Sequence, residues 1–190
     1  MPAAAEKSWT AAEYLEFERR SEIRHEFFGG EIFALSGASL KHNRIVRNVL
    51  AALHRQLGGR GCEAFASDLR VKVSATGLYT YPDVVVVCGE PLLDDDQLDT
   101  LLNPVLIVEV LSPSTQDYDR GTKFEHYRTI ETFSEYLLIA QARPHVEHYV
   151  RRPDDTWLLS ETKEARDVLI LSSIDCRLPL VDVYSDLAGD

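Results

Sequence analysis

A single carboxylate interrupts one of the most apolar stretches of this chain. The segment PVLIVEVLS begins at Pro104, and Glu109 is the one charged residue in it. An isolated ionised carboxylate in such a buried strand would cost several kcal/mol unless another group compensated its charge. Glu109 therefore needs a positive partner, which is either a metal ion or a basic side chain.

A second carboxylate, Asp83, opens the preceding apolar run, YPDVVVV. If the two strands pair antiparallel, the start of one lies beside the end of the other. Side chains alternate between the two faces of a strand, so Asp83 and Glu109 can share a face. Two neighbouring carboxylates repel each other, and a hard divalent cation with oxygen ligands removes that penalty. The pair predicts a site for Mg²⁺ or Mn²⁺, which would activate water and stabilise a phosphoryl oxygen.

A lysine follows at a distance that could complete this site. Asp119, Lys123 and Tyr127 are spaced by four residues and would lie on one stripe of a helix. Lys123 could then reach the acidic pair, where it would orient the attacking water or stabilise the transition state. The alternative is a buried ion pair between Glu109 and Lys123 or an arginine, with no metal.

The elements that would carry these residues follow from the apolar periodicity. Capping-box spacing at Thr10 and Glu13 predicts a helix over residues 11–20, and HEFFGGEIFAL predicts a hairpin. Apolar residues at helical spacing predict a second helix over residues 39–57, which Gly58 and Gly59 end. Its polar side carries the most basic surface that the sequence suggests.

The rest of the chain predicts a sheet. The runs YPDVVVVCGE, PVLIVEVLS and EYLLIA are typical of strands covered on both faces, and AFASDLRVKV of a further strand. A helix is expected over residues 119–130, and HVEHYVRR, TWLLSET and VLILSS are expected to form antiparallel strands. The predicted fold class is therefore α/β, a mixed β-sheet flanked by helices with a C-terminal antiparallel meander. We expect a single domain over residues 1–190.

Composition limits the possible functions and locations. The net charge of −11 argues against indiscriminate DNA coating, although nuclease metal sites are themselves acidic. The three cysteines suggest neither a disulfide framework nor a zinc site, which fits a reducing compartment. The N-terminus MPAAAEKSW has no signal-peptide pattern, and no apolar run approaches the roughly 20 residues of a membrane span. A cytoplasmic protein is expected.

The order of these motifs resembles the PD-(D/E)XK nuclease superfamily and, within it, the restriction endonucleases of the Uma-two family. The resemblance covers nearly the whole chain. The matching segments are WTAAEYLEFE, HEFFGGEIFALSGAS with the histidine shortly after it, YPDVVVV, IVEVLSPST, DRGTKFEHY, EYLLI and the closing LPLVDVYSDL.

The resemblance implies a restriction-endonuclease-like fold, DNA as the substrate and a homodimer that pairs two sites. It assigns metal binding to Asp83 and Glu109 of this sequence. The usual family lysine lies two residues after the glutamate, where this chain has Leu111, so Lys123 on the neighbouring helix is the candidate replacement.

Two further residues enter through the resemblance alone. Glu31 and His42 match positions that the family pattern features near the site, and each would add a metal ligand or a phosphate contact.

Three classes of function are consistent with these observations. The first is a Mg²⁺-dependent endonuclease that hydrolyses DNA phosphodiester bonds, with Asp83, Glu109 and Lys123 as catalytic residues. The second is a catalytically inactive nuclease-fold protein that binds nucleic acid or protein, which Leu111 and the acidic charge favour. The third is a metal-assisted hydrolase of small phosphoesters. Divalent-cation binding separates the first from the second, and a substrate panel separates the first from the third.

Overall fold

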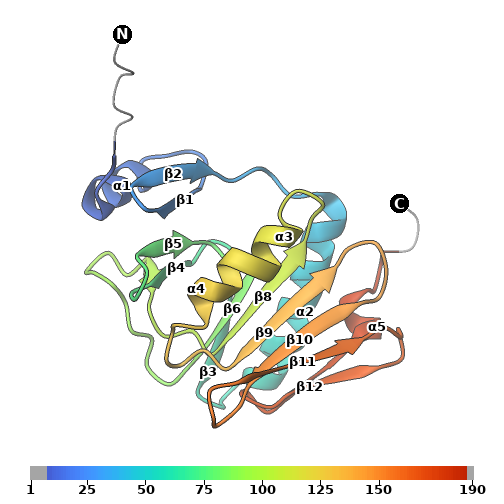
Figure 1. The fold of residues 1–190 in the computed structure, drawn as a ribbon. Coiled ribbons are helices and arrows are strands. Elements are labelled where there is room, and N and C mark those ends of the chain that lie inside the picture. The colour runs from blue at the N-terminus through green and yellow to red at the C-terminus, as the bar shows by residue number, and fades with distance from the viewer. Residues whose placement is uncertain (1–7, 188–190) are drawn as a thin grey trace.

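The computed structural model describes residues 8–187, and a mixed six-stranded sheet forms its centre (Figure 1). The strand order is β11-β10-β9-β8-β6-β3. Strands β8 and β9 pair in parallel, and the other neighbours in this sheet pair antiparallel. The bounds are β3 (Cys62–Ala66), β6 (Val84–Cys88), β8 (Leu106–Leu111), β9 (Glu135–Ala140), β10 (Val146–Arg151) and β11 (Trp157–Thr162).

A second sheet of five strands lies beside the first, in the order β2-β1-β5-β4-β7. Its strands are β1 (His25–Phe28), β2 (Glu31–Ala34), β4 (Arg70–Val73), β5 (Leu78–Thr80) and β7 (Thr100–Leu101). The hairpin between β1 and β2 turns at Gly29 and Gly30, whose φ angles of 61° and 88° suit glycine. Helix α1 (Ala11–Glu18) begins at the predicted capping box and packs Tyr14 against this sheet.

One predicted strand proves to be two. The segment AFASDLRVKV is divided by a turn at residues 67–69, so that β3 joins the six-stranded sheet and β4 the five-stranded one. Ser67 and Asp68 favour such a turn because their side chains compete with the sheet for backbone hydrogen bonds. The prediction of a single strand was therefore wrong.

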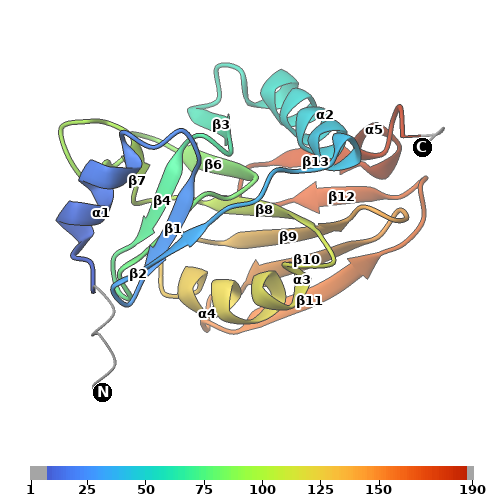
Figure 2. The same cartoon turned by 90° about the horizontal axis from the view of Figure 1, so that it is seen from above.

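Helices cover both faces of the six-stranded sheet, as Figure 2 shows from above. Helix α2 (Leu40–Leu57), capped by Ser39, buries Ile45, Val49 and Leu53 against one face. The opposite face carries a short composite helix made of α3 (Gln116–Tyr118), η1 (Asp119–Lys123) and α4 (Phe124–Tyr127). The helix expected over residues 119–130 thus starts earlier, and its central turn is π-helical.

The C-terminal strands confirm the predicted meander in part. Strands β9, β10 and β11 run antiparallel in succession. The next strand, β12 (Val168–Leu171), leaves the meander and pairs with β13 (Cys176–Pro179) in a separate two-stranded sheet. The alternation of buried and exposed residues in β12 lets it cover the α2 side of the core, together with α5 (Leu180–Val183).

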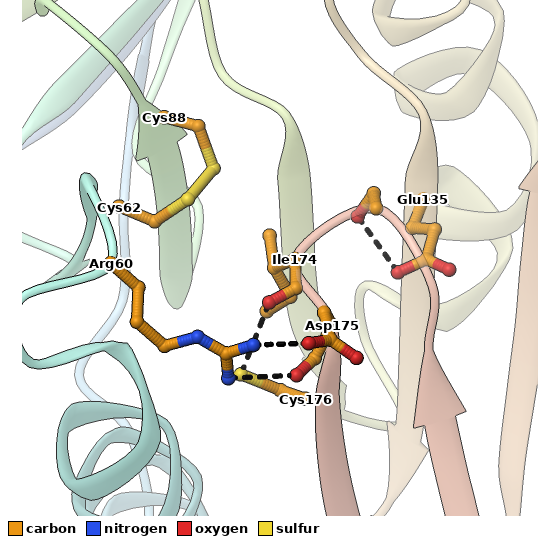
Figure 3. The surroundings of a disulfide bond; sticks show 8 residues. Arg60, Cys62, Cys88, Glu135, Ile174, Asp175 and Cys176 are labelled. Atoms are coloured by element: carbon orange, nitrogen blue, oxygen red, sulfur yellow. Dashed lines mark hydrogen bonds and ion pairs between the residues drawn. A yellow bond between two sulfur atoms is a disulfide. The ribbon is translucent and has the colours of Figure 1, made fainter.

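The cysteine prediction was wrong. Cys62 and Cys88 are direct partners in the register of β3 and β6 and form a disulfide, whereas Cys176 is free and buried (Figure 3). The two cysteines are 26 residues apart in sequence, a spacing that carries no disulfide pattern of its own. Strand register alone brings them together, and the argument for a reducing compartment loses its basis.

Residues 8–187 contain no helix that combines the length and the apolar composition needed to cross a lipid bilayer. Residues 1–7, on which the export prediction largely rests, lie outside the described part of the chain.

The disulfide should stabilise the fold because it restricts the conformations that the unfolded chain can adopt. We expect reduction to lower the free energy of unfolding by about 2–4 kcal/mol, as is typical of such cross-links. Urea unfolding with and without a dithiol reductant measures this difference. The double variant Cys62→Ser/Cys88→Ser should no longer respond to reductant, and an equal response in wild type and double variant would contradict the prediction.

Candidate active site

Strand register brings Asp83 and Glu109 to the same point of the sheet. β6 and β8 pair with Val84 opposite Val108, and the next pair in this register is Asp83 with Glu109. The backbone N–H of Asp83 lies 3.4 Å from Oε2 of Glu109, and the N–H of Val110 donates to Oδ2 of Asp83 at 2.7 Å. The two carboxylates therefore converge where β6 begins and β8 approaches its end.

Lys123 occupies the centre of the cluster. Its Nζ lies 2.9 Å from Oε1 of Glu109, 3.3 Å from Glu26 and 3.5 Å from Asp119. The hydroxyl of Tyr127 donates to the same Oε1 of Glu109 at 2.9 Å. Only 8% of the Lys123 side chain is exposed, so these contacts form away from bulk water.

The composite helix supplies the lysine, as its spacing indicated. Asp119, Lys123 and Tyr127 all face Glu109 or one another, although residues 119–123 form a π-helical turn. Such turns are rare and occur frequently at functional sites. Leu111, at the usual family lysine position, is buried in the core beneath this helix.

His42 joins the site from the first turn of α2. Its Nε2 lies 2.9 Å from Oδ1 of Asp83, and its backbone N–H is held by the hydroxyl of the Ser39 cap. Asp83 thus has one oxygen bonded to Val110 and the other to His42.

Glu26 is the member of the cluster that the sequence analysis missed. This buried residue of β1 accepts hydrogen bonds from the Thr80 hydroxyl and from the Tyr118 hydroxyl at 3.2 Å, and forms an ion pair with Lys123. A carboxylate next to two phenylalanines in the strand HEFF was the available signal, of the same kind as Glu109. Glu31 is instead exposed at the start of β2 and does not line the cleft described below.

The cluster lies in an open cleft with a volume of about 920 Å³. The connection from β2 to α2, residues 35–39, and the first turns of α2 line one part of it. Residues 112–115 and Tyr118 line another part, and Asp83, Glu109 and Lys123 are accessible from it. A ligand in the cleft can therefore reach the carboxylates.

Burial and mutual repulsion shape the protonation of the cluster. Burial raises the pKa of Glu109 to about 8; the ammonium of Lys123 opposes this rise, and Asp119 and Asp83 add to it. Burial by itself would lower the pKa of Lys123, but the carboxylates around it outweigh burial and hold that pKa well above its usual value. The lysine is therefore charged, but its single positive charge does not balance the negative charge of the carboxylates around it.

The donor set suits a hard divalent cation with few protein ligands. Among residues 8–187 no group of three or more His, Cys, Asp or Glu side chains is arranged to hold a metal ion. An ion would thus depend on Oδ1 of Asp83, which also contacts Nε2 of His42, and on Oε2 of Glu109, because the other two oxygens are committed to Val110, Lys123 and Tyr127. Mg²⁺ commonly binds through one or two carboxylates and keeps several waters, so the residues fit it.

Comparisons with known proteins agree with this fold. Residues 11–179 match the model of the Uma2 family, described as "Putative restriction endonuclease". Two relatives come from Synechocystis sp. (strain ATCC 27184 / PCC 6803 / Kazusa). Uncharacterized protein sll1609 is 44% identical over 161 residues, covering 85% of this chain and 91% of that protein. Uncharacterized protein slr1290 is 36% identical over 187 residues, covering 98% and 97%.

A solved structure shares the architecture. The crystal structure of a putative nuclease belonging to DUF820 from Anabaena variabilis ATCC 29413 superposes with a TM-score of 0.74. The match covers 92% of this chain and 96% of that one, at 18% sequence identity. The likeness confirms the predicted fold class, a mixed sheet flanked by helices.

The raised pKa of Glu109 predicts a pH-dependent contribution to stability. A carboxyl whose pKa is higher in the folded state than in the unfolded state stabilises the fold at low pH, and the gain is lost as pH rises through the folded value. The free energy of unfolding of wild type, relative to Glu109→Gln, should therefore fall between pH 5 and pH 9. The expected slope approaches about 1.4 kcal/mol per pH unit.

Urea unfolding of both proteins across this pH range, with a chelator present to exclude divalent cations, measures the difference. A difference that stays constant, or that grows with pH, would show that Glu109 is ionised throughout.

Proposed function

The chain belongs to the Uma2 family of putative restriction endonucleases, and we propose that it is a Mg²⁺-dependent endonuclease that hydrolyses DNA phosphodiester bonds. Mn²⁺ would serve as an alternative ion. The observation that carries the proposal is the meeting of Asp83, Glu109 and Lys123 in one accessible cleft.

Asp83 and Glu109 are the proposed metal ligands. The oxygens proposed to face the ion are Oδ1, which His42 contacts, and Oε2, which lies 3.4 Å from the backbone nitrogen of Asp83. The other oxygen of each carboxylate is fixed by Val110 or by Lys123 and Tyr127. Such fixation would hold the ligands in place and limit reorganisation on binding. When bound, a divalent ion would activate water and stabilise charge on a phosphoryl oxygen. It would also supply the positive charge that the cluster lacks.

Lys123 is the proposed substitute for the lysine that Leu111 replaces. Its ammonium is charged and borders both the cleft and Glu109. From there it would orient the attacking water or stabilise the negative charge of the transition state. Glu26 and Asp119 hold the ammonium from other sides, and so restrict where it can move.

His42 is proposed as an accessory residue. Its Nε2 contacts the Asp83 oxygen that would face a metal ion, so it either orients this carboxylate or contacts a phosphate nearby. Glu31, which is exposed outside the cleft, has no contact with the cluster that would support a catalytic role. The homodimer and the cytoplasmic location stay predictions.

The second candidate is a catalytically inactive nuclease-fold protein that binds nucleic acid or protein. The observation that favours it is the ion pair itself, because Lys123 and Tyr127 already satisfy one oxygen of Glu109 without any metal. Buried charges are tolerated when they are paired in this way.

Cleavage assays separate the two candidates. Supercoiled plasmid and labelled oligonucleotide DNA are incubated with Mg²⁺ or Mn²⁺, and a chelator should abolish cleavage. Asp83→Asn, Glu109→Gln and Lys123→Met are each expected to lower the rate by about 100-fold or more, because each removes a preorganised charge. Glu63→Gln and Lys163→Met, which change exposed residues away from the cleft, serve as matched controls and should cleave like wild type.

Cleavage that survives in both Asp83→Asn and Glu109→Gln would refute the assigned roles. If wild type cleaves nothing, and calorimetry detects no Mg²⁺ or Mn²⁺ binding at millimolar concentration, the inactive binding protein is the better description.

A further inference from the structure

The cleft offers little free positive charge to a polyanion. Its lining contains seven carboxylate residues, Glu18, Glu22, Glu26, Asp68, Asp83, Glu109 and Asp119, but two cationic ones, Arg24 and Lys123. Arg24 is paired with Asp68, and Lys123 with the central carboxylates. Both cations of the lining are therefore neutralised within the protein.

The arginines of α2 lie outside the cleft lining, and two of them are paired with carboxylates. Arg47 lies 3.4 Å from Asp186, and Arg55 lies 3.8 Å from Asp182. Duplex DNA binding depends largely on phosphates that release counterions when lysine and arginine contact them. The cleft lining is poorly equipped for that mode, so a nucleic-acid substrate there needs another source of affinity.

Exposed aromatic rings beside the cluster can provide it. Phe33 on β2 is the direct cross-strand partner of Glu26, so both side chains stand on the same face of the hairpin. Glu26 in turn contacts Lys123 and the hydroxyl of Tyr118, which lines the cleft. Phe33 is 47% exposed.

Phe28 extends the same surface. It lies two residues after Glu26 on β1 and therefore points to the same face, is 39% exposed, and contacts the ring of His126 at 4.6 Å. Strand β2 is the edge of its sheet, so no further strand of the five-stranded sheet lies beyond Phe33. The hairpin of β1 and β2, which Figure 1 shows, thus carries two exposed rings on the face that bears Glu26.

We propose that Phe33, with Phe28 beside it, is a stacking platform for unpaired bases, and that the substrate is single-stranded DNA. This inference rests on the proposed nuclease function and specifies its substrate. In a duplex the base faces are covered by neighbouring bases, whereas a single strand can lay them on aromatic rings. Stacking of this kind contributes about 1–3 kcal/mol per base and tolerates any base sequence.

The platform and the acidic cleft complement each other. Rings that hold bases on the hairpin would keep the strand bound without a metal ion, and a divalent cation would then let its backbone approach Lys123 and the carboxylates. Because the binding energy comes mainly from stacking, affinity should depend only weakly on salt, in contrast to a protein that relies on many phosphate contacts.

Fluorescence anisotropy with a labelled 15-nucleotide single strand and its duplex tests the proposal, with a chelator present to prevent cleavage. Wild type should bind the single strand at least about tenfold more tightly than the duplex. Phe33→Ala should weaken single-strand binding by about 10- to 100-fold, corresponding to the stacking of one base. Phe33→Trp should retain it, and Ile170→Ala, which removes an exposed apolar side chain of β12, should bind like wild type.

Thermal unfolding and light scattering accompany the binding assays. Phe33→Ala should keep the melting temperature and the oligomeric state of wild type. If this substitution dissociates a dimer, the rings are covered by a second copy of the chain and the platform is refuted. Preference for the duplex, or a steep loss of single-strand binding between 50 and 200 mM salt, would refute it as well.

The failure of this inference is distinguishable from the failure of the proposed function. DNA cleavage that requires Asp83 but ignores Phe33 and prefers a duplex would leave the nuclease and remove the platform. Phe33-dependent binding of single-stranded DNA without any cleavage would leave the platform and remove the nuclease.

Discussion

An imbalance of charge at one buried point governs this structure. Glu26, Glu109 and Asp119 come from three segments of the chain and surround one ammonium, that of Lys123, and Asp83 joins them beside Glu109. Placing so many carboxylates out of water is unfavourable unless positive charge accompanies them. Lys123 supplies part of that positive charge. The pKa of Glu109 is nevertheless raised, because burial and the neighbouring carboxylates disfavour its ionised form. A proton or a bound divalent cation would neutralise the remaining negative charge. With a proton the site would be a stable ion cluster, and with a divalent cation it would be a catalytic centre.

The same cluster joins the parts of the fold. Glu26 belongs to the five-stranded sheet, Glu109 to the six-stranded sheet and Lys123 to the composite helix that covers the latter. Their contacts therefore tie two sheets and a helix together at the cleft, close to the loop that leads into α2. Leu111 fills the core beneath the composite helix, so the positive charge beside Glu109 comes from Lys123 on that helix. The π-helical turn at residues 119–123 contains Lys123 and places its ammonium beside Glu109.

Several features of the site were predictable because they depend on local periodicity. Alternation along two apolar strands put Asp83 and Glu109 on one face, and four-residue spacing put Lys123 on the stripe that meets them. Other features depended on contacts between distant segments. Glu26 lies in a short strand of the five-stranded sheet, whereas Glu109 belongs to the six-stranded one. No spacing of residues in the sequence therefore indicates that Glu26 approaches Lys123. The disulfide of Cys62 and Cys88 likewise arises from the register of β3 and β6. The departure of β12 from the meander reflects the need to cover the α2 face of the core.

The sequence by itself determined the type of fold and the two carboxylates, Asp83 and Glu109, that share one face of the sheet. Those properties follow from which residues are apolar and at what period, which is information held within each segment. Only the tertiary structure decided which carboxylates surround Lys123, how His42 contacts Asp83 and where the exposed rings of the hairpin stand. These relations depend on how sheets and helices pack, because the energy of a buried charge is set by every segment around it.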